Sequence, residues 1–395
     1  MAVIETSACV RLGNGAALER LVCHPRLPLV AGLDSERPAV HVWDCGANGL
    51  QSLGTVGGGS AVYAQDAGIL RGDWTPAVAW HPDQPLLLVA TEGGVVRWTP
   101  QGVSALEGVP PTADYRSLAF SPDGHTLWAS PSSGDADEWE SSDVLTLTPG
   151  TVGTGPPWDT GVEVHPAGGL VVTLCSEQGA TLVIFARVDQ DSVPARMRVQ
   201  RRALMLDGDF YQKPIFSSDG RYFAIRGNAH DNLLEVFEFP SLQRAWTATL
   251  GEPRPSFLRQ QGWWERMRIW SRHNIAFGVR PAVLWIGTPA GTLVEVDPKS
   301  QRTVEHPVLA GSPVTGVGVT ATGDLVVASG GGDLVLLSVA DDAADATAAD
   351  SDTLQAMVTA FLDATSEVPD YGDLATQLVL TDIEPPWESA AAATA

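Results

Sequence analysis

The chain has 395 residues, of which 44% are hydrophobic and 18% are charged, and its formal net charge is −23. This composition belongs to a folded protein and excludes a disordered one, and no apolar stretch is long enough to span a membrane. Because so acidic a chain repels nucleic acid and anionic membrane surfaces, we expect neither of them as a partner.

The first strand-like run covers residues 2–12 and stands apart from the repeats that follow it. The last repeat ends at Val339 with three apolar runs and lacks a fourth. An unpaired outer edge is costly, and pairing the two ends of the chain would remove it. We therefore expect Val3–Leu12 to pair beside Asp333–Val339.

Seven copies of one β-meander fill most of residues 17–340. The clearest copy, residues 77–100, reads AVAWHPDQPLLLVATEGGVVRWTP and has turns at 81–83 and 92–94. Short runs rich in Val, Leu and Trp, bounded by Pro, Asp and Gly, are typical of β-strands joined by tight turns. The closest copies lie 40 residues apart, from His81 to Ser121, which matches a four-stranded propeller blade. The sequence predicts an all-β, seven-bladed β-propeller over residues 1–340.

Several turns and strand ends of these copies resemble those of WD40-type propellers. The resemblance rests on the Asp-Gly turns at 121–124 and 217–220, the His-Pro turns at 24, 81 and 165, and the strand ends Trp-Asp at 43 and Trp-Thr at 98. It implies the propeller fold, but the Gly-His pairs of that family are missing and Trp-Asp occurs once. We therefore expect the usual hydrogen-bonded tetrads to be largely absent and core packing to stabilise the blades. The Lys-poor composition, rich in Ala and Gly, indicates a bacterial source.

Two groups of potential metal ligands have simpler explanations. The loop at 131–143 carries five carboxylates, but their spacing departs from that of an EF-hand, so we expect a solvated acidic hairpin loop. The four cysteines have no metal-ligand spacing, and the N-terminus lacks a secretory signal pattern. We expect free core thiols, a cytoplasmic location, and no metal site.

The fourth copy leads into the basic stretch RMRVQRR at residues 196–202. On a strand, Arg196 and Arg198 project from the same face because alternate residues share a face. We expect an outer strand whose edge is protected by charge.

The segment at 254–274, between the fifth and sixth copies, is rich in both Arg and Trp. Such clusters are typical of binding hot spots, which favours a surface for a protein or peptide. In the main alternative, Trp264, Met267 and Ile269 lie in a blade core and the arginines face outward. Stacking on nucleic acid is a further alternative that the net charge disfavours. The candidate partner-binding residues here are Arg259, Trp263, Trp264, Arg266, Arg268, Trp270 and Arg272.

The chain changes character at residues 341–395, which contain twelve acidic residues and no Lys or Arg. After a low-complexity acidic linker, apolar residues follow the spacing of an amphipathic helix. This helical tail either packs on the propeller or docks into a partner's groove, and it could also fold over the Arg/Trp segment. Its candidate contact residues are Leu354, Met357, Val358, Phe361 and Leu362.

No catalytic or cofactor-binding motif accompanies the repeats, and three of the eight histidines precede Pro at repeat turns. We therefore expect no catalytic residues and no cofactor. The function predicted is a non-catalytic scaffold or adaptor that binds other proteins in a multi-protein bacterial assembly. The alternative is a propeller enzyme, similar to a lactonase or hydrolase, that acts on a small molecule at the central channel.

Overall fold

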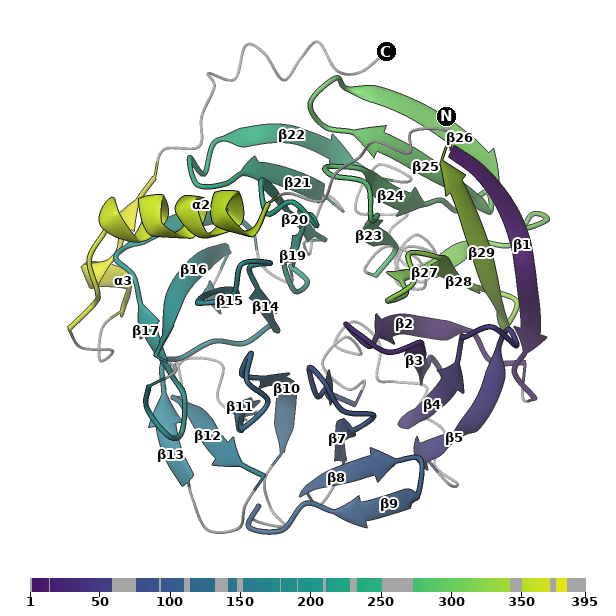
Figure 1. Ribbon diagram of the computed structural model, residues 1–395, viewed down its shortest axis with the longest axis horizontal. Helices are drawn as coiled ribbons and strands as arrows, with labels where there is room; N and C mark the ends of the chain where they lie inside the picture. The colour runs from purple at the N-terminus through teal and green to yellow at the C-terminus, as the bar shows by residue number, and fades with distance from the viewer. Residues whose placement is uncertain are drawn as a thin grey trace, which may run out of the picture.

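Seven β-sheets stand around a central axis as the blades of a ring (Figure 1). Six sheets have four antiparallel strands, and the seventh, blade four, has additional ones. This arrangement confirms the predicted seven-bladed β-propeller. The computed structural model describes residues 2–13, 15–58, 76–91, 94–109, 114–131, 141–147, 152–177, 179–189, 191–208, 211–227, 233–250, 273–341, 350–369 and 374–381.

The blades follow one another along the chain, and each begins with its innermost strand. Blade one contains β2 (Leu18–Cys23), β3 (Leu29–Asp34), β4 (Ala39–Asp44) and β5 (Gln51–Gly57). Blade two contains β6 (Val78–Trp80), β7 (Leu87–Thr91), β8 (Gly94–Thr99) and β9 (Gly102–Ala105). Blade three contains β10 (Tyr115–Phe120), β11 (Thr126–Pro131), β12 (Ser142–Thr146) and β13 (Val152–Gly155).

The remaining blades keep this order. Blade four contains β14 (Val162–Val164), β15 (Leu170–Glu177), β16 (Ala180–Asp189), β17 (Arg196–Val199), β18 (Arg202–Asp207) and β30 (Val379–Leu380). Blade five contains β19 (Ile215–Phe216), β20 (Tyr222–Arg226), β21 (Leu233–Glu238) and β22 (Arg244–Thr249). Blade six contains β23 (Ile275–Phe277), β24 (Leu284–Gly287), β25 (Thr292–Asp297) and β26 (Arg302–Pro307). Blade seven contains β27 (Val314–Val319), β28 (Leu325–Ser329), β29 (Asp333–Asp341) and β1 (Ala2–Arg11).

The first strand of the chain closes the ring. Strand β1 pairs antiparallel with β29, from Val3 opposite Ala340 to Arg11 opposite Asp333. It is thus the outermost strand of blade seven, as the sequence predicts. The pairing satisfies the edge of β29, which would otherwise present unpaired backbone groups.

Blade four is wider than the others because its third strand is long. Strand β16 has ten residues; its last part pairs with β17 and its first part with β18. The expected alternation in β17 is present, since Arg196 is exposed and Met197 and Val199 are buried. Strand β30, from the end of the chain, then adds to β18 in parallel.

The C-terminal region forms two helices besides β30. Helix α2 (Ser351–Asp363) begins after Asp350, whose side chain accepts a hydrogen bond from the Asp352 N–H, and α3 is Leu374–Gln377. In Figure 1, α2 lies across blades four and five, away from β1 and β29. None of the described helices is long and apolar enough to cross a membrane.

The hydrophobic core consists of layers between neighbouring blades. The second strands β3, β20 and β28 are buried along their whole length, whereas the outer strand β26 is largely exposed. Between blades one and two, Trp80 and Trp98 meet edge to face with ring centroids 5.9 Å apart, and Trp98 is 2% exposed. Each blade therefore covers an apolar face of the next.

Replacing Trp98 with Ala should lower the free energy of unfolding by about 3–5 kcal/mol, the usual cost of emptying a buried Trp site. Val103, on the neighbouring strand β9, is 52% exposed, so Val103→Ala should change it by less than about 0.5 kcal/mol. Urea unfolding of both variants measures the difference. Equal midpoints for Trp98→Ala and the unmodified chain would contradict the core position of Trp98.

Candidate functional site

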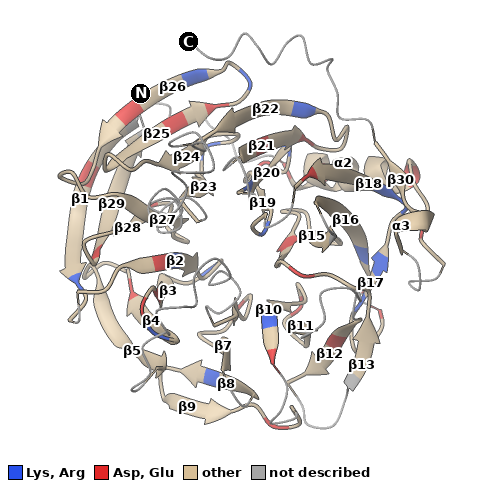
Figure 2. Ribbon diagram, turned by 180° about the vertical axis from the view of Figure 1, so that it is seen from behind, with Lys and Arg blue, Asp and Glu red and all other residues tan. Residues whose placement is uncertain are grey.

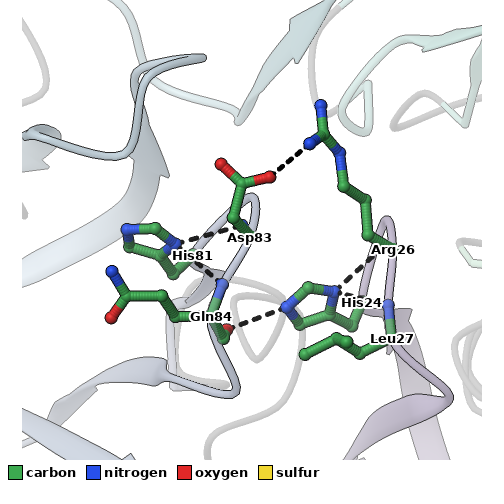
Figure 3. Close-up of polar contacts among 6 residues, drawn as sticks. All are labelled: His24, Arg26, Leu27, His81, Asp83 and Gln84. Atoms are coloured by element: carbon green, nitrogen blue, oxygen red, sulfur yellow. Dashed lines mark hydrogen bonds and ion pairs between the residues drawn. The ribbon is translucent and has the colours of Figure 1, made fainter.

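Three histidines occupy the same place in blades one, two and four, the turn between the first and second strands. His24, His81 and His165 are all buried. In blade one, His24 Nδ1 accepts hydrogen bonds from the backbone N–H groups of Arg26 and Leu27, each at 3.0 Å. The Nδ1 atoms of His81 and His165 hold their own turns in the same way (Figure 3 shows His24 and His81).

The other ring nitrogen of each histidine faces the next blade. His24 Nε2 donates to the carbonyl of Gln84 in blade two at 2.9 Å (Figure 3). His165 Nε2 donates to the carbonyl of Gly220 in blade five at 3.2 Å. A Cβ atom on Gly124 in blade three would lie 2.3 Å from His81 Nε2, so that ring fills the space beside this glycine. The three imidazoles therefore connect the turns of successive blades.

The electrostatics of these rings suit a structural role. Burial lowers the pKa of His24, of His81 and of His165, and the pKa of His165 falls to about 4. A neutral imidazole with its proton on Nε2 satisfies both hydrogen bonds of His24 and His165. Nearby, Arg26 and Asp83 form an exposed ion pair between the first two blades (Figure 3), a kind of contact that contributes little stability.

Two buried carboxylates connect the third strands of blades five and six to other elements. Glu235, on β21, accepts hydrogen bonds from the Tyr211 hydroxyl at 3.2 Å and from Arg244 at 2.8 Å. Burial raises the pKa of Glu235, and the Arg244 guanidinium opposes this shift. Glu295, on β25, binds Arg280 and His306 in a similar arrangement. The sequence predicts that core packing stabilises the blades and that the usual hydrogen-bonded tetrads are largely absent. The structure contains two polar networks in blades five and six, and each has its own set of residues.

A hydroxyl, an imidazole and a carboxylate also come together in blade one. His41 Nδ1 lies 3.0 Å from Thr55 Oγ1, and His41 Nε2 lies 3.4 Å from Asp34 Oδ2. Asp34 is buried and its other oxygen accepts N–H groups of its own turn. The order of groups is that of a nucleophilic triad, but Thr55 lies on the outer strand β5, away from the channel. We interpret this contact as a brace between strands β3, β4 and β5.

The helical tail is the second candidate site, and its apolar face is turned toward the ring. Val358 and Phe361 are fully buried, and Met357 and Leu362 are partly buried against the same core cluster. The Phe361 ring packs against Phe185 of blade four and Phe239 of blade five, with centroids 5.0 and 5.2 Å apart. Leu354, which is partly buried, lies near the turn at Gly220. In the structure, the described part of the tail packs on its own ring, which is one of the predicted alternatives.

After α2, the described residues of the tail lie along the basic stretch of blade four. Thr365 Oγ1 and the Ser366 carbonyl accept the N–H groups of Arg202 and Arg201, at 3.0 and 2.8 Å. Glu367 forms an ion pair with Arg187. Beyond α3, the N–H of Val379 donates to the Arg201 carbonyl as β30 joins the sheet. The stretch 196–202, expected as a charged outer edge, is thus where the tail is attached, through backbone hydrogen bonds of Arg201 and Arg202 for which the sequence carries no signal.

The other candidate residues lie outside the described part of the chain. The Arg/Trp segment that the tail was predicted to cover and residues 132–140 of the acidic loop also lie outside the described residues. The residues in question are Arg259, Trp263, Trp264, Arg266, Arg268, Trp270 and Arg272.

The fold places this chain among the seven-bladed β-propellers. No family model matches the sequence, and no curated protein matches it. Within the described ranges, no group of three or more His, Cys, Asp or Glu side chains has an arrangement that could hold a metal ion. The four cysteines are free thiols.

The histidine turns predict that the protein becomes less stable in mild acid. The unfolded chain takes up a proton at His165 near the ordinary pKa of 6.5, whereas the folded chain does so only near 4. The stabilising contribution of His165 is therefore fully present above about pH 6.5. As the pH falls from 6.5 to 4, this group lowers the free energy of unfolding by about 3 kcal/mol. Urea midpoints measured between pH 7.5 and 4.5 give this slope.

The variant His165→Gln should be less stable than the unmodified chain at pH 7.5 but should show a flatter pH dependence. His125 is exposed, so His125→Gln is a matched control that should keep the original slope. If His165→Gln keeps the original slope as well, the assignment of the acid sensitivity to His165 is wrong.

Proposed function

We propose that this propeller is a non-catalytic, WD40-like scaffold that binds other proteins in a multi-protein assembly of the bacterial cytoplasm. The observation that supports the proposal is the ring's own recognition of a protein segment. Blades four and five bind residues 350–369 and 374–381: the tail inserts Phe361 between the two blades, and its strand β30 extends the sheet of blade four. These are two of the recurring ways in which proteins bind peptides.

The charge and the thiols of the chain support the finer parts of this proposal. A net charge of −23 favours proteins over nucleic acid or membrane surfaces as partners. Four free cysteines fit a reducing compartment. The turn histidines are held by hydrogen bonds on both ring nitrogens in blades one and four, which leaves those rings no lone pair for acid–base chemistry.

Capture of partners by the full-length chain from its native cells tests the proposal. The bound material is analysed by native mass spectrometry, so that proteins and small molecules are detected in one sample. We expect one protein in stoichiometric amount that remains bound through size-exclusion chromatography. A stoichiometric small molecule with no protein partner would contradict the scaffold and favour the enzyme.

A further inference from the structure

The tail docks far from the blade to which it is covalently attached. It leaves the ring at β29 in blade seven, and residues 342–349 separate that strand from Asp350. The contacts given above are with blades four and five, and Figure 1 shows α2 on the other side of the ring from β29. The surface beneath it, called the tail site below, consists of Arg187, the edge of β18 and the pocket beside Phe185 and Phe239.

The tail site is basic on an acidic protein. Arg187 on β16 pairs with Glu367 of the tail, and Arg202 on β18 lies over the Phe361 ring; Figure 2 shows the basic segments of both strands. The tail that covers this surface has acidic residues and no Lys or Arg. Charge complementarity of this kind steers a segment to its site and sets its register. Of the neighbouring arginines, Arg198 pairs with Asp189 of the same blade.

The tail fills the tail site incompletely. An open groove of about 420 Å³ lies between α2 and blade four, beside the turn at Gly168 and Gly169. Gln355 of α2 lines it together with Arg187 and Asp189. The ion pair between Arg187 and Glu367 is also weak, because both side chains are more than two-fifths exposed. The open groove and the exposed ion pair leave room for a segment that binds more tightly than the tail does.

We propose that the tail site is a docking surface for a partner protein and that the tail occupies it in cis. The occupant in trans is an acidic amphipathic helix with an aromatic anchor, followed by a short extended apolar segment that adds to β18. This inference rests on the proposed scaffold function and names its binding surface. Because the tail is tethered, only a segment that binds better than the tail displaces it.

The first experiment asks whether an added peptide can replace the tail while the ring stays folded. A cleavage sequence for a specific protease is inserted within residues 342–349, and a fluorescent peptide of residues 350–381 is added to the cut protein. We expect saturable binding by fluorescence anisotropy with an unchanged melting temperature of the ring. The peptide with Phe361→Ala should bind about 100-fold more weakly, because it loses the buried anchor.

The second experiment uses charge reversal at the exposed ion pair. The peptide with Glu367→Lys should bind about fivefold more weakly, and Arg187→Glu on the ring should restore its binding. Arg302, exposed on blade six, supplies the control variant Arg302→Glu, which should change nothing.

The third experiment connects the tail site to the captured partner in the uncut protein. Phe361→Ala weakens the tail and should increase partner binding, and adding Arg187→Glu to Phe361→Ala, where the tail no longer competes, should reverse that increase. A partner that responds to neither variant would overturn this inference and leave the scaffold proposal intact. Failure to capture any protein contradicts the scaffold itself.

Two other outcomes would overturn the inference directly. One is a tail that exchanges with peptide only when the ring unfolds. The other is a concentration-dependent dimer of the uncut protein, in which the tails of two copies are exchanged and a second copy replaces the partner.

Discussion

Each blade of this ring has an apolar face that the next blade covers, and the structure depends on that constraint. The core is accordingly divided among the seams between blades and does not form one central mass. A ring of this kind is stable only when its last seam and its last edge are closed. Strand β1 meets that requirement by pairing with β29, so residues more than 320 apart in the chain form one edge strand pair.

The seam between blades four and five also binds the tail. Phe185, Phe239 and Phe361 form an aromatic group there, and His165 contacts Phe239 with ring centroids 4.9 Å apart. The tail, the histidine turn and the basic stretch of blade four therefore meet at one place. His165 thus lies beside an aromatic residue that holds the tail.

The repeat pattern made most of the ring predictable. Short apolar runs bounded by Pro, Asp and Gly leave little ambiguity about strands, and the unsatisfied edge of the last repeat required the first strand. The double outer strand of blade four was missed, because the long β16 reads as one ordinary run. Strand β30 has two residues, too few for any periodic signal, and its partner lies about 180 residues earlier. The polar networks of Glu235 and Glu295 were missed because their members lie on different elements.

If the tail is bound to the ring as a separate segment, as we propose, it opens without the ring unfolding. Hydrogen–deuterium exchange of the intact protein tests this most directly, because amides report local and global opening separately. We expect the amides of α2, such as that of Phe361, to exchange through an opening of lower free energy than that of the amides in β16 and β20. Their exchange should depend little on dilute urea. Exchange of α2 at the same free energy as those strands would show that the tail opens only when the ring unfolds.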